Sequence, residues 1–77
     1  RFNRGSTTIS YSIHKPSKVK IQMYNIKGQL VETLEDTDRP AGSHRVDWNA
    51  KDMSSGIYFY KLTTEEKTFI KKMILLK

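Results

Sequence analysis

The chain contains no cysteine, few turn-forming residues and no long apolar run. The absence of cysteine among 77 residues excludes disulfides, zinc–thiolate sites and cysteine nucleophiles. No stretch approaches the ~20 apolar residues of a membrane-spanning helix, so stable membrane insertion is not expected. The length allows one small domain, residues 1–77. Because the sequence starts without methionine or an apolar signal region, we expect it to be a piece of a longer protein.

The charge balance is basic, with 14 Lys and Arg against 8 Asp and Glu and a net charge of +6. Such a charge is compatible with a nucleic-acid or acidic-surface partner. Four lysines nevertheless alternate with apolar residues, as on the solvated face of a sheet, so no nucleic-acid partner is expected: Lys15, Lys18, Lys20 and Lys27. A denser group gathers toward the end of the chain: Lys61, Lys67, Lys71, Lys72 and Lys77.

Apolar residues recur with a period of two in most of the chain, which is typical of half-buried strands. The alternation predicts strands at the following ranges: 8–14, 18–23, 30–34, 46–48, 57–62 and 68–77. Residues 25–29, with Gly28 to supply a positive φ, predict a hairpin turn, and the polar run 35–42 predicts a longer loop. The strand 57–62 carries apolar side chains on both faces and should lie centrally in a sheet.

The number and spacing of these segments predict the fold class. Six or seven short strands with turns between them are typical of an all-β antiparallel sandwich of immunoglobulin-like type.

Residues with catalytic or metal-binding chemistry form no recognisable motif. His14 and His44 lie on different strands with no local nucleophile signature, so we predict exposed polar strand ends. The carboxylates at 36, 38, 47 and 52 lack the spacing of a calcium loop, and the neighbours Glu65 and Glu66 lack the spacing of a glycosidase pair. We therefore predict no catalytic residue, no metal site and no cofactor.

The aromatic residues leave two alternatives open. Trp48, Tyr24, Tyr58 and Tyr60 could form a sugar-stacking platform, as in a non-catalytic carbohydrate-binding accessory module of an extracellular enzyme. The favoured interpretation is that these residues fill a small core that has no other bulk.

Several blocks of the sequence together resemble one known family. The blocks are residues 3–13, Val19 to Leu34 with Met-Tyr-Asn-Ile-x-Gly-Gln, residues 41–50, Ser-Gly-Ile-Tyr-Phe-Tyr at 55–60, and Lys-Lys-Met-Ile-Leu-Leu-Lys at 71–77. In combination they resemble the type A C-terminal sorting domain of the type IX secretion system. That domain is similar to the immunoglobulin-like domain of the flagellar hook-capping protein, so a hook-cap-like assembly module is a second alternative. The family's Asn-Pro-Phe-Asn-Pro start is replaced here by Phe-Asn-Arg-Gly-Ser at 2–6.

The resemblance implies a sorting signal without catalytic activity. Such a domain is linked covalently to an N-terminal cargo protein, in a Bacteroidetes-like bacterium, and directs it through the periplasm and the type IX translocon. A sortase-like peptidase commonly removes the domain, and the cargo stays on the cell surface or becomes extracellular.

The last predicted strand is the candidate recognition element. An edge strand offers unpaired backbone groups to a partner, and the lysines would steer association. The predicted partner-binding residues are Lys71, Lys72, Met73, Ile74, Leu75, Leu76 and Lys77. Either alternating pair, Met73 with Leu75 or Ile74 with Leu76, could instead complete the core, and so apolar an edge is a hazard for self-association.

Overall fold

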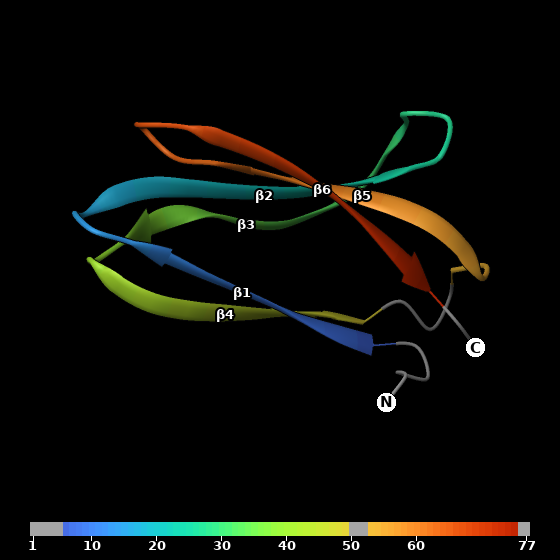
Figure 1. The fold of residues 1–77 in the computed structure, drawn as a ribbon, viewed down its shortest axis with the longest axis horizontal. Coiled ribbons are helices and arrows are strands. Elements are labelled where there is room, and N and C mark those ends of the chain that lie inside the picture. Colours follow the sequence, from blue (N-terminus) through green and yellow to red (C-terminus); the bar gives the residue numbers. More distant parts are fainter. Residues whose placement is uncertain (1–5, 50–52, 76–77) are drawn as a thin grey trace.

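The computed structural model describes residues 6–49 and 53–75, which form six strands and no helix (Figure 1). The strands are β1 (Ser6–Ile13), β2 (Ser17–Asn25), β3 (Leu30–Arg39), β4 (Gly42–Asn49), β5 (Gly56–Thr63) and β6 (Thr68–Leu75). None of the described residues belongs to a helix that could cross a membrane. The all-β prediction is confirmed.

The strands form two antiparallel sheets, one of two strands in the order β1-β4 and one of four in the order β3-β2-β5-β6. Figure 1 shows the four-stranded sheet lying above the β1-β4 pair. In chain order the strands correspond to B, C, C′, E, F and G of an immunoglobulin-like sandwich, in which B pairs with E and C lies between C′ and F. As predicted, the strand with two apolar faces, β5, lies inside its sheet.

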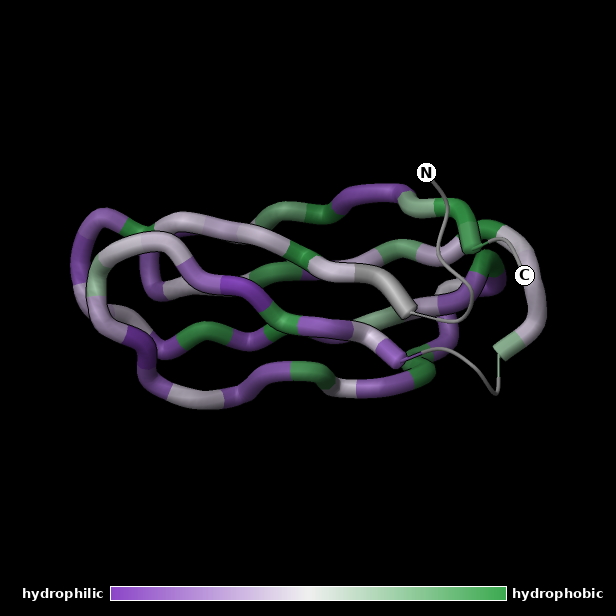
Figure 2. Tube along the Cα trace, turned by 90° about the horizontal axis from the view of Figure 1, so that it is seen from below, coloured by the Kyte–Doolittle hydropathy of each residue, from purple (hydrophilic) through white to green (hydrophobic). Residues whose placement is uncertain are grey.

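The core lies between the sheets and takes the inward residues of each alternating strand. Its buried members are Ile9, Val19, Ile21, Met23, Trp48, Tyr58, Leu62 and Leu75. Figure 2 shows the alternation of apolar and polar residues along the strands. Because successive side chains of a strand point to opposite faces, this period alone directs one set of side chains to the core.

A tyrosine at the start of β5 makes a contact typical of immunoglobulin-like domains. The Tyr58 hydroxyl donates to the carbonyl oxygen of Ser54 at 2.8 Å, four residues upstream. Its ring meets Trp48 edge-on, with ring centroids 5.2 Å apart. A tyrosine on the strand equivalent to F that bonds back to the preceding segment is the tyrosine corner of this fold. This corner and the strand order identify the sandwich as immunoglobulin-like.

The prediction of a loop at residues 35–42 is wrong for most of that range. β3 continues to Arg39, paired with Ser17, and only Pro40 and Ala41 separate β3 from β4. β3 is an edge strand, and most of its polar residues, such as Asp36, Thr37 and Asp38, are exposed, so an apolar alternation is not required. Its register against β2 shifts twice, and the unpaired residues of the shifts, Val31 and Leu34, pack against the core.

The predicted hairpin turn between β2 and β3 is confirmed. Gly28 has φ of 82°, a left-handed conformation that glycine adopts without strain, and its N–H donates to the carbonyl of Asn25 at 2.9 Å. The Asn25 side chain also accepts hydrogen bonds from the backbone N–H groups of Lys27 and Gln29. The turn thus fixes the register of the hairpin at its closed end.

Candidate functional site

β6 is an open edge of the four-stranded sheet. It pairs with β5 over its whole length, from Thr68 opposite Thr63 to Leu75 opposite Gly56, and no other described strand pairs with it. Six of its eight residues are exposed, including Ile70 at 66% and Ile74 at 63%. Exposed isoleucines on an unpaired edge are unusual, because such an edge is a template for the addition of another strand.

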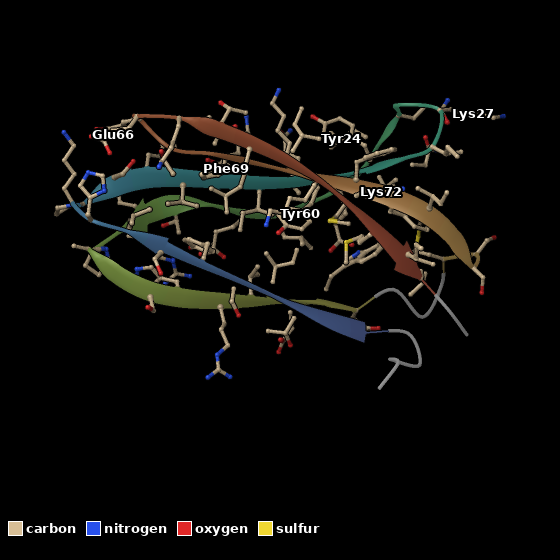
Figure 3. The ribbon with its side chains drawn as sticks, viewed as in Figure 1. Tyr24, Lys27, Tyr60, Glu66, Phe69 and Lys72 are labelled. Atoms are coloured by element: carbon tan, nitrogen blue, oxygen red, sulfur yellow. The ribbon has the colours of Figure 1, made fainter. Side chains whose placement is uncertain are left out.

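The register with β5 determines which way each β6 side chain points. Phe69, Met73 and Leu75 lie opposite Leu62, Tyr58 and Gly56 on the inward face. Ile70, Lys72 and Ile74 alternate with them and lie on the outward face, where Figure 3 labels Lys72.

The predicted partner-binding residues therefore divide into two groups. Leu75 is buried and Met73 is half-buried against the core, so this alternating pair completes the sandwich. Lys71, Lys72 and Ile74 are exposed. The last two residues of the set, Leu76 and Lys77, lie outside the described residues, as do Asp52 and residues 1–5.

The backbone of β6 presents free hydrogen-bonding groups in a definite order. Next to the turn, Thr64 N–H donates to the Lys67 carbonyl at 2.8 Å. Because hydrogen-bonded and non-hydrogen-bonded pairs alternate along an antiparallel ladder, and this register has no shift, the outward residues occupy non-bonded positions. The N–H and C=O groups of Ile70, Lys72 and Ile74 therefore point toward the open edge.

The lysines of β6 give this edge a positive charge. Among the described residues, neither Lys71 nor Lys72 has an ion-pair partner, and β6 contains no Asp or Glu. The predicted solvated lysines, Lys15, Lys18, Lys20 and Lys27, are all exposed, which confirms that interpretation.

The turn that leads into β6 is held by contacts from distant parts of the chain. Glu66 contacts His14 Nε2 at 3.1 Å and Lys15 Nζ at 3.2 Å. The Ser17 hydroxyl, buried at the start of β2, accepts the backbone N–H of Glu65 at 2.9 Å. Sequence reasoning missed these contacts because their partners lie far apart in the chain.

Acidification should loosen this turn. The hydrogen bond from Lys15, followed by the charges of His14, Lys15 and Lys67, lowers the pKa of Glu66 despite some burial. A carboxylate whose folded pKa is lowered stabilises the fold above its unfolded pKa, about 4.3 for glutamate, and this contribution is lost as the pH falls through the folded pKa. We expect acid to lower the thermal midpoint of the wild type more than that of E66Q. An identical pH dependence of the two midpoints would contradict this assignment.

The two histidines make different contacts. His14 follows β1 and is exposed, as predicted. His44 is half-buried, so the prediction of an exposed position is wrong for this residue. Its Nε2 lies 2.7 Å from the carbonyl oxygen of Pro40 and its ring 5.4 Å from that of Tyr11, because β4 begins at Gly42 and pairs His44 with Tyr11.

A cluster of half-buried polar side chains lies between β1 and β3. The Arg39 guanidinium forms an ion pair and a hydrogen bond with Glu35, whose side chain is 8% exposed. Burial, followed by the charge of Glu35, raises the pKa of Tyr11, whose hydroxyl lies beside this pair. In residues 6–49 and 53–75 no three His, Asp or Glu side chains are grouped to hold a metal ion.

The four aromatic residues of the predicted platform do not share one exposed face. Trp48 and Tyr58 are buried, which confirms that they fill the core. Tyr60 packs against the core and is half-buried. Tyr24 lies opposite Phe59 on the outward face of the four-stranded sheet, so the core interpretation is wrong for that residue. The residue that would dominate a sugar platform, Trp48, is out of reach of a ligand.

The fold and the open edge define a small immunoglobulin-like module with one sheet edge that no described strand covers. A comparison with protein families makes the assignment more specific. The family model of the secretion system C-terminal sorting domain matches residues 3–76, nearly the whole chain. The chain belongs to this family. Comparisons with curated proteins and with solved structures give no significant match.

Family membership establishes what the domain does. It is a C-terminal sorting signal of the type IX secretion system, recognised by that machinery while linked to the cargo that it directs. Its destination is the cell surface or the extracellular space. The family acts as a secretion signal and is not catalytic.

Proposed function

We propose that the type IX machinery recognises this domain by adding a strand to the open edge of β6. The observation that carries the proposal is that no described residue pairs with the outer side of β6, while the outward residues of β6 direct backbone groups and exposed side chains to that side. The recognition segment comprises Lys71, Lys72, Met73, Ile74, Leu75, Leu76 and Lys77.

Each part of β6 has a separate role in this proposal. Buried Leu75 and half-buried Met73 hold the strand on the core. Backbone groups at the edge give affinity, and a partner pocket for Ile74 gives selectivity. Lys71 and Lys72, which form no ion pair in the described part of the chain, increase the rate of encounter with an acidic receptor.

The wider pathway follows from the same role. In the proposed sequence of events, one domain spanning residues 1–77 follows an N-terminal cargo protein. The cargo and domain cross the periplasm, reach the translocon and meet a sortase-like peptidase. The domain performs no reaction of its own. The translocon and the peptidase each bind it as a ligand.

A proline at the edge tests backbone recognition directly. Lys72→Pro removes an N–H that points away from β5, so the ladder of β5 and β6 is preserved while strand addition is blocked. With a reporter cargo fused ahead of the domain in a bacterium that has a type IX system, export should fall at least about tenfold. Lys72→Ala, which keeps the N–H, should stay within about threefold.

The thermal midpoint of each variant separates recognition from folding. If Lys72→Pro unfolds the domain, Ile70→Pro provides the same test at a second edge position nearer the turn. Normal export of a folded edge-proline variant, or equal loss with Lys72→Ala, would refute recognition through the backbone of β6.

A further inference from the structure

The two sheets differ in width, and this leaves a groove on the inward side of the sandwich. Sheet β1-β4 has two strands, whereas the sheet that faces it has four. A cavity of about 250 Å³ lies between β1 and the inward face of β5 and β6. One wall is formed by the consecutive residues 10–15, and the other includes Tyr60, Leu62, Phe69 and Lys71. Figure 3 shows the labelled Tyr60 and Phe69 between β6 and β1.

One wall of the groove is a second unpaired strand edge. β1 pairs with β4 on one side, and no described residue pairs with its other side. In a seven-stranded immunoglobulin-like sandwich, strand A lies beside strand B, which corresponds to β1 here. The groove therefore includes the backbone edge beside which strand A lies in such a sandwich.

The floor of the groove is apolar and incompletely covered. Leu62 is 3% exposed, but its cross-strand neighbour Phe69 is 43% exposed although it points inward. Phe69 is exposed because no described strand of the opposite sheet covers β6. An extended segment beside β1 would place alternate side chains over this floor.

The charges around the groove define the chemistry of that segment. The lining contains Lys15, Lys67, Lys71 and His14 against one acid, Glu66. Glu66 already contacts His14 and Lys15, and Lys67 lies 5.2 Å from the centre of the Phe69 ring. Lys71 is exposed, points inward beside Tyr60 and has no ion-pair partner within the described residues. This excess of cations favours an acidic occupant and disfavours a second copy of the basic chain.

We propose that this groove binds an extended segment of a partner protein in which apolar and acidic residues alternate. The segment pairs with the free edge of β1 and covers Leu62 and Phe69 with apolar side chains. An acidic side chain of the segment meets Lys71. The site goes beyond the proposed function, because it uses the inward side of β6 and the backbone of β1 instead of the open edge of β6.

Synthetic peptides test the groove with the 77-residue chain itself. The probe is a peptide of about nine residues, long enough to span the groove wall, that alternates valine and glutamate. Its controls are a valine–lysine peptide, a non-alternating peptide of the same composition, and a backbone N-methylated peptide. In an NMR titration the acidic alternating peptide should shift amide signals of β1 and bind at least about tenfold tighter than each control.

Adjacent residues on opposite faces of β6 supply matched variants. Phe69→Ser should weaken binding of the acidic peptide by about tenfold or more, whereas Ile70→Ser should leave it within about twofold. Lys71→Glu should reverse the preference toward the valine–lysine peptide, and Lys20→Glu, on the outward face of β2, should not. If Phe69→Ser fails to fold, the reversal by Lys71→Glu decides the result.

Several outcomes would overturn the proposal. The first is equal binding of the acidic peptide to the Phe69→Ser and Ile70→Ser variants. The second is a shift of amide signals at the open edge of β6 instead of β1. The third is a dimer of the wild-type chain that Phe69→Ser abolishes. A chain extended ahead of Arg1 that no longer binds the peptide would show that the groove is filled from the same polypeptide, and would also overturn it. The groove proposal is tested by peptide binding and the proposed function by export of the Lys72→Pro variant. The failure of one proposal is therefore distinguishable from the failure of the other.

Discussion

Replacing Trp48 by alanine should unfold much of the domain. The indole is completely buried, packs edge-on against Tyr58, and its N–H donates to Glu32 at 3.2 Å. Loss of a buried tryptophan costs about 3–5 kcal/mol, against a total stability of about 4–12 kcal/mol for a domain of this length. Urea titration followed by far-ultraviolet circular dichroism measures the change. Fluorescence is unsuitable because Trp48 is the only tryptophan.

Trp48→Phe is the control for this prediction. It keeps an aromatic ring next to Tyr58 but loses volume and the hydrogen bond to Glu32, so we expect a loss of about 1–3 kcal/mol. A Trp48→Ala domain as stable as the Trp48→Phe domain would show that the contact between the sheets does not depend on the indole.

Leu75→Ala should destabilise the domain strongly, whereas Ile74→Ala should not. Leu75 is 4% exposed and Ile74 is 63% exposed, although they are neighbours on β6. Truncation of a buried leucine costs about 2–5 kcal/mol, and an exposed substitution usually stays within about 0.5 kcal/mol. The free energies of unfolding of the two variants, from denaturant titration, give a direct comparison.

The same two variants separate folding from recognition in an export assay. If β6 is read as proposed, Ile74→Ala reduces export while the domain stays folded, and Leu75→Ala reduces export in proportion to unfolding. Similar unfolding free energies for the two variants would contradict the assignment of inward and outward faces on β6.

The period of two in the sequence predicts most of this fold, because it depends only on which side chains avoid water. The alternation of Ile9, Tyr11 and Ile13, and that of Val19, Ile21 and Met23, predicts β1 and β2 closely. β3 escapes the pattern because an edge strand with polar residues resembles a loop. Thr37 and Asp38 are exposed, and their extended conformation depends on pairing with β2, which sequence spacing alone does not specify.

The position of the candidate site in the sequence was predictable, but the direction in which each of its side chains points was not. The run of apolar residues and lysines at 71–77 is visible in the sequence, yet the alternation allows either Met73 and Leu75 or Ile74 and Leu76 to face inward. The register with β5 decides between them for residues 73–75. The groove was not predicted, because it depends on β1 lying opposite β5 and β6 and on the unequal widths of the two sheets.

The edge of the four-stranded sheet opposite β6, which is formed by β3, limits how these domains could assemble. β3 has two shifts of register and exposed carboxylates at Asp36 and Asp38, features that discourage docking of a foreign strand. A sheet in which one edge can pair with another strand and the other edge cannot is able to add only one further sheet. Two copies joined through β6 would thus make a closed pair with protected outer margins, not a fibril, so crowded exported molecules would not polymerise through this sheet.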